Sequence, residues 1–280
     1  MMRITLLGTG TPILDPKRQP SALFVEVGAE KLLFDAGWGT ITQLVRAGIR
    51  PQYINPIFIT HHHYDHIGNL GEFLLTSWYY GREEPLNVHG PPGTAQIVAA
   101  LLEQVYAREI AFALFNDDNL VDIRDLVQVK EVARGLVYDS GKCQVLTEYV
   151  EHGNKLGLSR IDWPCLGYRI EAEGKVVAIS GDTVACAGLD RLADGADVLI
   201  QCCYLAEAEI ANPAFERLAQ YIIASSGQVG KIATRNKVKK LVLTHIRPKS
   251  EAMMQSLIKD VRKDYSGELY LGEDLMVIEV

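Results

Sequence analysis

The greatest density of potential metal-binding side chains lies in residues 60–70, THHHYDHIGNL, which hold four of the chain's seven histidines. Imidazole nitrogens and carboxylate oxygens are ligands that a borderline ion such as Zn²⁺ accepts. The alternating His61 and His63 can point two rings to one side, and Asp65 and His66 add a carboxylate and a third ring. This spacing supplies too many ligands for one tetrahedral ion. It therefore indicates two metal ions lying close together.

Two ions need further ligands, and three candidates each follow a short apolar run. His152 comes after LTEYVE, Asp182 after VVAIS, and His245 after LVLT. A lone histidine is more often a hydrogen-bonded or surface residue, but that account fits poorly when five of seven histidines belong to one set. We predict three ligands on each ion and one bridging carboxylate: His61, His63 and His152; Asp65, His66 and His245; and Asp182 between them.

The two remaining histidines fall outside this ligand set. His62 is expected at the edge of the pocket or behind the ligands. His89 is expected to be structural, because it is the last residue of a predicted strand before a Gly-Pro-Pro-Gly turn.

The elements that must position these residues are short apolar runs alternating with amphipathic stretches. The predicted strands cover residues 4–7, 23–27, 31–35, 56–60, 86–89, 127–132, 144–150, 166–171, 176–180, 198–202, 241–244, 269–271 and 276–279. The predicted helices cover residues 40–47, 67–77, 94–106, 213–224, 227–234 and 251–264. Residues 107–125 follow no clear period and are expected to form an insertion or cap. Many strands separated by helices imply a layered α/β fold.

Bulk composition limits the class of protein. With 280 residues, 48% of them hydrophobic, the chain can bury a large core, and we expect one domain over residues 1–280. The net charge of −7 argues against a large basic face for nucleic acid. The chain has five cysteines, none in Cys-x-x-Cys spacing, which predicts reduced thiols. We find no signal-peptide pattern and no long apolar run, so we expect a cytoplasmic protein without membrane contact.

Longer segments resemble the metallo-β-lactamase superfamily, whose members carry His-x-His-x-Asp-His followed by distant His, Asp and His ligands. Within it, the chain is similar to the branch of ribonuclease Z and the arylsulfatase-like hydrolases. The segments that carry this similarity occur in the same order and span nearly the whole chain: LLGTGTPILDPKRQPSALFVEV, LLFDAGWGT, THHHYDHIGNL, LNVHGPPGT, ISGDT and VKKLVLTHI.

The resemblance implies a four-layer αββα sandwich with two divalent metal ions at one edge between the sheets. Zn²⁺ is the expected ion, and Mn²⁺ or Fe²⁺ fit the same ligands. Redox relatives with two irons place a carboxylate where His63 stands, so the histidine implies a hydrolase. Asp35 matches a family position that orients a ligand, and Asp65 has a plausible second role in proton transfer. The branch is often dimeric, which makes a homodimer through residues 107–125 a candidate.

The implied reaction is hydrolysis of an ester by a hydroxide shared between the two ions. A small phosphodiester is our first expectation for the substrate, and a phosphotriester, a sulfate ester or a lactone are alternatives. Ribonuclease Z activity on precursor tRNA is a further alternative, as is a scaffold that has lost catalysis. Three departures count against tRNA: Ile246-Arg-Pro-Lys249 replaces Ser-Pro-Arg-Tyr, the proton-donating histidine before VGKIA is absent, and a family glutamate is replaced near Cys202.

Substrate contacts are expected from aromatic and basic residues near the ligands. Arg247 is a candidate for neutralising an anionic oxygen, and the Gly-rich segment 152–163 is a candidate lid. The candidate aromatic walls are Trp38, Tyr64, Phe112, Phe115, Trp163 and Tyr204.

Overall fold

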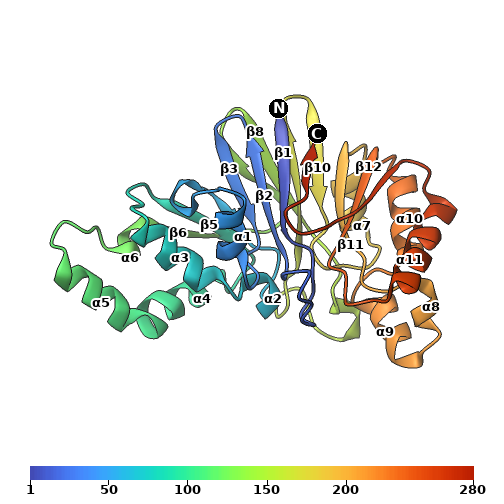
Figure 1. Cartoon of the computed structure of the whole chain (residues 1–280), viewed down its shortest axis with the longest axis horizontal. Helices are drawn as coiled ribbons and strands as arrows, with labels where there is room; N and C mark the ends of the chain where they lie inside the picture. The colour runs from blue at the N-terminus through green and yellow to red at the C-terminus, as the bar shows by residue number, and fades with distance from the viewer.

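Two seven-stranded sheets form the centre of the molecule in the computed structural model, which describes residues 1–280 (Figure 1). The first sheet has the order β14 (Val277–Glu279), β1 (Met2–Gly8), β2 (Ala22–Val27), β3 (Glu30–Phe34), β4 (Ile57–Phe58), β5 (Leu86–Gly90) and β6 (Val127–Glu131). The second sheet has the order β13 (Glu268–Leu271), β12 (Lys240–Thr244), β11 (Val198–Cys202), β10 (Lys175–Ile179), β9 (Leu166–Ala172), β8 (Cys143–Tyr149) and β7 (Gly135–Asp139).

Helices cover the outer face of each sheet, so the layers follow the order αββα that the resemblance implied (Figure 1). Beside the first sheet lie α1 (Thr40–Arg46), α2 (Tyr64–Ile67), α3 (Leu70–Tyr79), α4 (Thr94–Ala100), α5 (Ala107–Asn116) and α6 (Ile123–Leu126). Beside the second lie α7 (Ala187–Ala193), α8 (Glu207–Ile210), α9 (Pro213–Tyr221), α10 (Ser226–Arg235) and α11 (Glu251–Asp264). Two 3₁₀ turns are η1 (Pro51–Tyr53) and η3 (Asn154–Leu156), and η2 (Leu101–Val105) is a π-helical segment that continues from α4. None of these helices is both long and apolar enough to cross a membrane.

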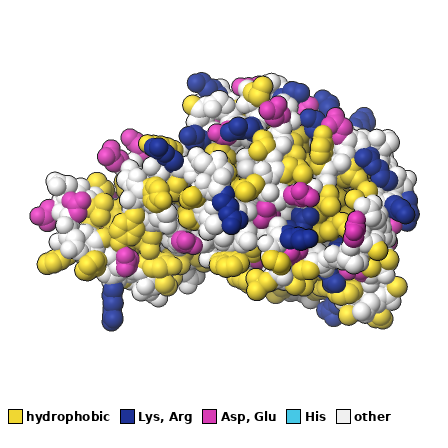
Figure 2. Space-filling view, viewed as in Figure 1, with side chains coloured by type: hydrophobic (Ala, Val, Ile, Leu, Met, Phe, Trp, Pro, Cys, Tyr) yellow, Lys and Arg dark blue, Asp and Glu magenta, His cyan; other side chains and the backbone are white.

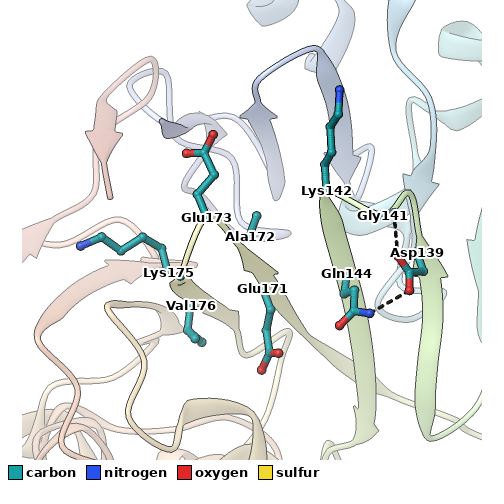
Figure 3. A pocket seen from close by; sticks show the side chains of 10 residues that line it. Asp139, Gly141, Lys142, Gln144, Glu171, Ala172, Glu173, Lys175 and Val176 are labelled. Atoms are coloured by element: carbon teal, nitrogen blue, oxygen red, sulfur yellow. Dashed lines mark hydrogen bonds between the residues drawn. The ribbon is translucent and has the colours of Figure 1, made fainter.

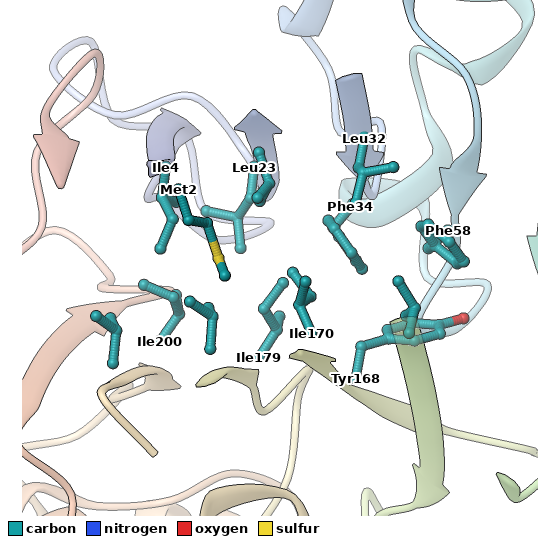
Figure 4. Packing of buried hydrophobic residues seen from close by; sticks show 14 of the residues in the cluster. Met2, Ile4, Leu23, Leu32, Phe34, Phe58, Tyr168, Ile170, Ile179 and Ile200 are labelled. Carbon is teal, nitrogen blue, oxygen red and sulfur yellow. The ribbon is translucent and has the colours of Figure 1, made fainter. Parts of the chain in front are cut away.

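The central strands of both sheets, such as β1, β2 and β11, are buried on both faces, which explains their nearly continuous apolar runs. In β2, Leu23, Val25 and Val27 point into the core between the sheets, whereas Ala22 and Phe24 point toward the helices. Figure 4 shows the inner core, where side chains from the two sheets meet. This packing fixes the two sheets relative to each other, and therefore fixes the loops at their shared edge.

Strand direction brings the predicted ligands to that edge. In the first sheet β3, β4, β5 and β6 are parallel, and in the second β10, β11, β12 and β13 are parallel. Because β8 and β10 both pair antiparallel with β9, β8 runs in the same direction as β10. The carboxyl ends of β8, β10 and β12 therefore lie together.

The structure also differs from the predicted elements in several places. The helix predicted over 67–77 is α3, which begins at Leu70, and a separate short helix, α2, precedes it. Residues 107–125 contain α5 and α6, and α5 extends away from the sheets at the far left of Figure 1. The strand β7 and the helices α7 and α8 had not been predicted.

Candidate metal centre

The segment after β4 carries the first four predicted ligands. His63 is extended (φ −62°, ψ 144°) and directly precedes α2, and its carbonyl accepts hydrogen bonds from the backbone of His66 and Ile67. Asp65 and His66 therefore lie in this one-turn helix, ahead of the helix predicted to begin at residue 67. The turn folds His66 back against His61, with the two ring centroids 4.1 Å apart. The four side chains thereby lie close together, His61 and His63 in one group and Asp65 and His66 in a second.

The three later candidates come from the second sheet. His152 follows β8, Asp182 follows β10, and His245 follows β12. All three are buried. The structure brings together all seven predicted residues as two groups, in each of which the candidate ligand atoms lie within 4.8 Å of one another: His61, His63, His152 and Asp182; and Asp65, His66 and His245.

Asp182 lies between the two groups. Its Oδ2 is 4.0 Å from Nε2 of His152 in the first group, and 3.6 Å and 3.2 Å from Nε2 of His66 and His245 in the second. Asp65 faces the second group, with Oδ2 3.1 Å from Nε2 of His245. One carboxylate thus reaches both clusters of nitrogen atoms.

Neighbouring groups determine which nitrogen of each ring faces the cluster. The Nδ1–H of His66 donates to Oδ2 of Asp35 at 2.7 Å, and the Nδ1–H of His152 donates to the carbonyl of Ile222 at 2.6 Å. The hydroxyl of Thr60 donates to Asp35 and accepts from Nδ1 of His61 at 3.0 Å. The Nε2 atoms of these three histidines therefore face the cluster. Burial alone would lower the pKa of His66, but the carboxylates of Asp182 and Asp35 raise it well above its ordinary value, so a metal ion bound here would displace a proton from this ring.

These ring nitrogens converge in a way that fits a bound cation. Nδ1 of His63 lies 3.0 Å from Nε2 of His61 and 3.2 Å from Nε2 of His152. A proton on His63 satisfies only one of these two lone pairs, whereas a divalent cation accepts all three nitrogens. The buried Nε2 of His66 likewise has no hydrogen-bond partner within the protein. The donor set, imidazole and carboxylate, is the one that Zn²⁺ prefers.

The electrostatics of the unloaded cluster support the same conclusion. Burial, followed by the charge of His66, lowers the pKa of His61 well below its ordinary value, and burial with His152 lowers the pKa of His63 to about 4. Burial alone would raise the pKa of Asp182, but His245 and His66 hold it well below its ordinary value. At neutral pH the first group therefore presents neutral imidazoles and a carboxylate, which are metal-binding forms.

Two residues of the site adopt a left-handed backbone. Asp35 has φ 59° and His245 has φ 53°, values that are uncommon outside glycine. Such conformations cost about 1–3 kcal/mol and tend to occur where function requires them. In Asp35 the turn directs the carboxylate to the backbone N–H and hydroxyl of Thr60, 2.8 Å and 2.9 Å away.

A cavity of about 140 Å³ opens beside the two groups. One half of its lining consists of predicted ligands: His63, Asp65, His152, Asp182 and His245. The other half is apolar: Pro12, Tyr204, Leu218, Ile222 and Ile223. No lysine or arginine lines it.

The remaining predicted residues lie at different distances from this cavity. The Tyr204 side chain lines it, and the Trp163 ring lies 4.7 Å from that of His63. Tyr64 is exposed, and its hydroxyl donates to the carbonyl of Pro12. His62 instead binds the hydroxyl of Thr94 at the start of α4, at 2.8 Å.

Arg247 does not reach the cavity lining. Its guanidinium packs over the rings of Tyr204 and Phe215, 5.9 Å and 4.7 Å from their centroids, and forms an ion pair with Glu209 at 3.1 Å. Phe112 and Phe115 are also outside the site, because they lie on α5 with 66% and 84% of their surface exposed.

Sequence reasoning did not find the apolar wall or the hydrogen-bond acceptors behind the ligands. Leu218 lies in α9, and Ile222 and Ile223 directly follow it. Any helix packed on a core carries such apolar residues, so their types did not indicate a cavity. The acceptor of Ile222 is a backbone carbonyl and leaves no trace in residue type. Thr60 could have been identified from the sequence as a residue that supports the ligands, because it directly precedes the first of them.

A larger hollow, of about 520 Å³, lies at the opposite edge of the second sheet, between the β7–β8 and β9–β10 turns (Figure 3). Its side chains carry charges of both signs, and Asp139 is held by Gly141 and Gln144. It contains no histidine or cysteine and no converging carboxylates near metal-binding distance. The chemistry of the molecule is therefore concentrated at the other edge.

Comparison with known proteins places the chain in a family. The family model described as anti-Pycsar protein Apyc1 matches residues 2–224. The ribonuclease Z of Mycobacterium bovis is 32% identical over 289 residues, covering 100% of this chain and 99% of that protein. The ribonuclease Z of Mycobacterium avium is also 32% identical, over 286 residues with the same coverage.

Solved structures share the fold across the whole chain. The metallo-β-lactamase fold protein YhfI from Bacillus subtilis superposes with a TM-score of 0.74 at 18% identity, covering 99% of this chain and 98% of that one. The short form of human tRNase Z gives a TM-score of 0.73 at 24% identity with the same coverage. A diphosphatase of the PhnP family gives 0.71 at 18% identity, covering 100% and 98%. The chain therefore belongs to the metallo-β-lactamase superfamily, in its ribonuclease Z branch, and is a metal-dependent hydrolase.

Proposed function

We propose that the protein is a phosphodiesterase that uses two divalent metal ions, Zn²⁺ first among them, to hydrolyse small phosphate esters. The observation that carries this proposal is the position of Asp182, whose single Oδ2 lies within 4.0 Å of nitrogen atoms in both groups. A carboxylate placed between two sets of three ligands is the arrangement that a pair of ions requires. The residues that would hold the ions are His61, His63 and His152 for one, Asp65, His66 and His245 for the other, and Asp182 for both.

The reaction we propose is direct hydrolysis. Metal ions held here would lower the pKa of a bound water toward 7 and stabilise negative charge on the oxygens around phosphorus. A water oxygen bonds to phosphorus, and the phosphorus–oxygen bond to the leaving group breaks. The water proton passes to a base and the leaving oxygen gains a proton, so the products are a phosphomonoester and an alcohol or phenol.

Asp65 is the base we propose. Its carboxylate faces the cavity and hydrogen-bonds to His245. Burial alone would raise the pKa of Asp65, but the hydrogen bond from His245 and the charge of His66 lower it. The carboxylate is therefore ionised at neutral pH and able to accept a proton.

The supporting residues hold the ligands in place. Asp35 accepts from His66 and from Thr60, and Thr60 in turn accepts from His61. Such partners orient a ligand ring and raise its basicity. They turn Nε2 of each ring toward the cluster, where a metal ion would bind it in place of a proton.

The shape and charge of the cavity favour a small ester over tRNA. About 140 Å³ accommodates a phosphoryl group and one modest substituent, and no lysine or arginine lines it. Nucleic acids are gripped mainly through basic contacts to their phosphates, and the chain carries a net charge of −7. Sulfate esters and phosphotriesters have a tetrahedral centre like that of a phosphodiester, and lactones have a carbonyl that a metal ion can polarise. All three remain alternative substrates to test.

Ribonuclease Z activity is the second candidate, because relatives with that name align over the full length of the chain at 32% identity. A homodimer is proposed alongside either activity. The exposed aromatic face of α5 is the contact we propose for it, and Figure 2 shows apolar side chains over that helix at the left of the molecule.

The deciding experiment combines metal analysis with a substrate panel. Protein purified without chelator and reconstituted with Zn²⁺ is expected to hold two ions per chain and to hydrolyse bis(p-nitrophenyl) phosphate. An aryl sulfate, a lactone and a precursor tRNA are assayed beside it. Clean cleavage of the precursor tRNA with little small-ester turnover would overturn the first candidate in favour of the second, and one ion per chain would contradict the binuclear site.

A further inference from the structure

The apolar half of the cavity comes largely from one segment. Leu218 lies in α9, and Ile222 and Ile223 follow its end, while Pro12 and Tyr204 close the sides. The rest of the lining consists of carboxylates and rings of the predicted metal centre. A phosphoryl group at the metal centre would therefore place one of its substituents against this apolar wall.

The size of the cavity limits that substituent. A dry cavity of about 150 Å³ lined by aliphatic and aromatic side chains accommodates a benzene ring. The cavity here is about 140 Å³, and part of it must hold the phosphoryl group. With a phosphoryl group at the metal ligands, a planar ring or a branched alkyl group would fill the rest of the cavity and extend into its opening, whereas only the first residue of an extended polymer could contact the wall.

The charges around the wall exclude a second anionic group. Arg247, which packs over the cavity residue Tyr204, and Lys249 both pair with Glu209, whose side chain is 7% exposed. Glu209 also accepts from the backbone N–H of Ala206 at the start of α8. Both cations therefore stabilise the position of α8 through their ion pairs with Glu209. An anionic substituent in the cavity would be desolvated without a countercharge, which is costly.

From this geometry we infer that the enzyme selects esters whose substituent is uncharged and apolar, an aryl group above all, and that Leu218, Ile222 and Ile223 determine this specificity. The inference rests on the proposed function, because it assumes that the substrate is a phosphate ester bound at the metal centre. It adds the chemical class of the substituent and names the residues that recognise it.

Binding of three phosphonates tests the inference without turnover. Phenylphosphonate, methylphosphonate and 4-phosphonobenzoate share one anionic head and differ in substituent, and calorimetry on the Zn²⁺-loaded protein gives their Kd values. A hydrophobic pocket distinguishes even one methylene by roughly 10–200-fold, so phenylphosphonate is expected to bind at least about 10-fold more tightly than methylphosphonate. Because of its added carboxylate, 4-phosphonobenzoate is expected to bind at least about 10-fold more weakly than phenylphosphonate.

A matched pair of variants assigns the effect to the wall. Leu218→Lys places an ammonium group in the cavity and is expected to make 4-phosphonobenzoate the tighter aryl ligand. Gln220→Lys adds the same charge to an exposed position of α9 outside the cavity and is expected to leave the order unchanged. Leu218→Ala, which adds no charge, is expected to shrink the preference for phenyl over methyl, and it serves if the lysine variant does not fold.

Equal affinity for phenylphosphonate and methylphosphonate would overturn the inference, as would equal responses to the two lysine variants. These outcomes differ from failure of the proposed function. If the protein hydrolyses no phosphate ester but still binds phenylphosphonate preferentially, the proposed reaction is wrong and the inferred specificity of the pocket stands.

Discussion

The two halves of the cavity are built in different ways. On the metal side, three of the five histidines have their second ring nitrogen fixed by a hydrogen bond, and the acceptors Asp35 and Thr60 are themselves bonded to each other. On the apolar side, the side chains of Leu218, Ile222 and Ile223 are placed by packing alone. Hydrogen bonds specify angles and packing specifies volume. In the function we propose, the first half would determine which reaction takes place, and the second would determine which ester undergoes it.

Removing the shared carboxylate is the strongest way to break the metal side. Asp182→Asn keeps the shape but takes away a charge that lies within 4.0 Å of both groups. We expect phosphodiester kcat/KM to fall by at least about 10³-fold, because losing the proposed bridging carboxylate would weaken the binding of both proposed ions. Steady-state kinetics and metal content measured on the same sample check this. Full activity with two ions still bound would refute the bridging role.

Disturbing the support behind a ligand should have a smaller effect. Asp35→Asn removes the anionic acceptor for Nδ1 of His66, and loss of such a partner typically costs 10–100-fold in metal affinity or activity. Competition with a chelator measures the affinity directly. His62→Gln is the matched control, because His62 bonds to Thr94 and not to a ligand. If both variants lose metal equally, the support assigned to Asp35 is wrong.

A change on the apolar side should separate substrate recognition from metal binding. Ile222→Ala shortens a side chain of the wall but keeps the backbone carbonyl that accepts from His152. We expect kcat/KM for aryl esters to fall by about 10-fold, in keeping with the loss of a few methylenes from a pocket, while metal content stays at the wild-type value. A loss of metal in this variant would show that the two halves are not independent.

His89 offers a contrast, since it is a buried histidine without a ligand role. It stacks on Phe58 with ring centroids 5.0 Å apart, and burial followed by the charge of Lys130 lowers its pKa to about 4. The unfolded chain, with a pKa near 6.5, takes up a proton below that pH while the folded chain does not. Stability is therefore lost as pH falls from about 6.5 toward 4.

Urea unfolding of metal-free protein at pH 7 and pH 5 measures this contribution. Wild type is expected to lose about 2 kcal/mol more than His89→Phe between the two pH values, and kcat/KM of the loaded variant at pH 7 is expected to be unchanged. Equal losses in the two proteins would show that His89 is not the residue responsible.

The smallest effect on catalysis is expected at α5. Phe115→Ser changes a side chain that is 84% exposed and belongs to neither half of the cavity. Activity should match wild type within error. Sedimentation equilibrium on the same variant tests the proposed dimer contact, because a dimer formed through this helix should dissociate more readily, and a weight-average mass equal to that of wild type would exclude this face.

Much of this architecture could be predicted from residue types. Histidine and aspartate at strand ends are unusual enough to identify His152, Asp182 and His245 among 280 residues, and the order of the quoted segments predicted the αββα sandwich, which the structure confirms. The strand β7 and the helix α7 had no such marker. The stretch containing β7 is short and partly polar, and α7 has only seven residues.

The apolar wall could not be predicted for a different reason. Leu218 and Ile222 are ordinary residues of an amphipathic helix and its end, and only the folded chain shows which of them face a cavity and which face the core. Arg247 illustrates the reverse case. Its charge suggested a substrate contact, but an ion pair with Glu209 and packing on two rings use it elsewhere.

The bond from His152 to the carbonyl of Ile222 has a consequence for how such enzymes diversify. A neighbouring bond, from the backbone N–H of Gly153 to the carbonyl of Tyr221 at 2.8 Å, joins the same two segments. Both acceptors belong to the main chain, so every side chain at these positions supplies them equally. Substitutions after α9 are therefore free to alter substrate choice across generations, whereas a single inserted or deleted residue there would shift the register of both carbonyls and misalign a ligand.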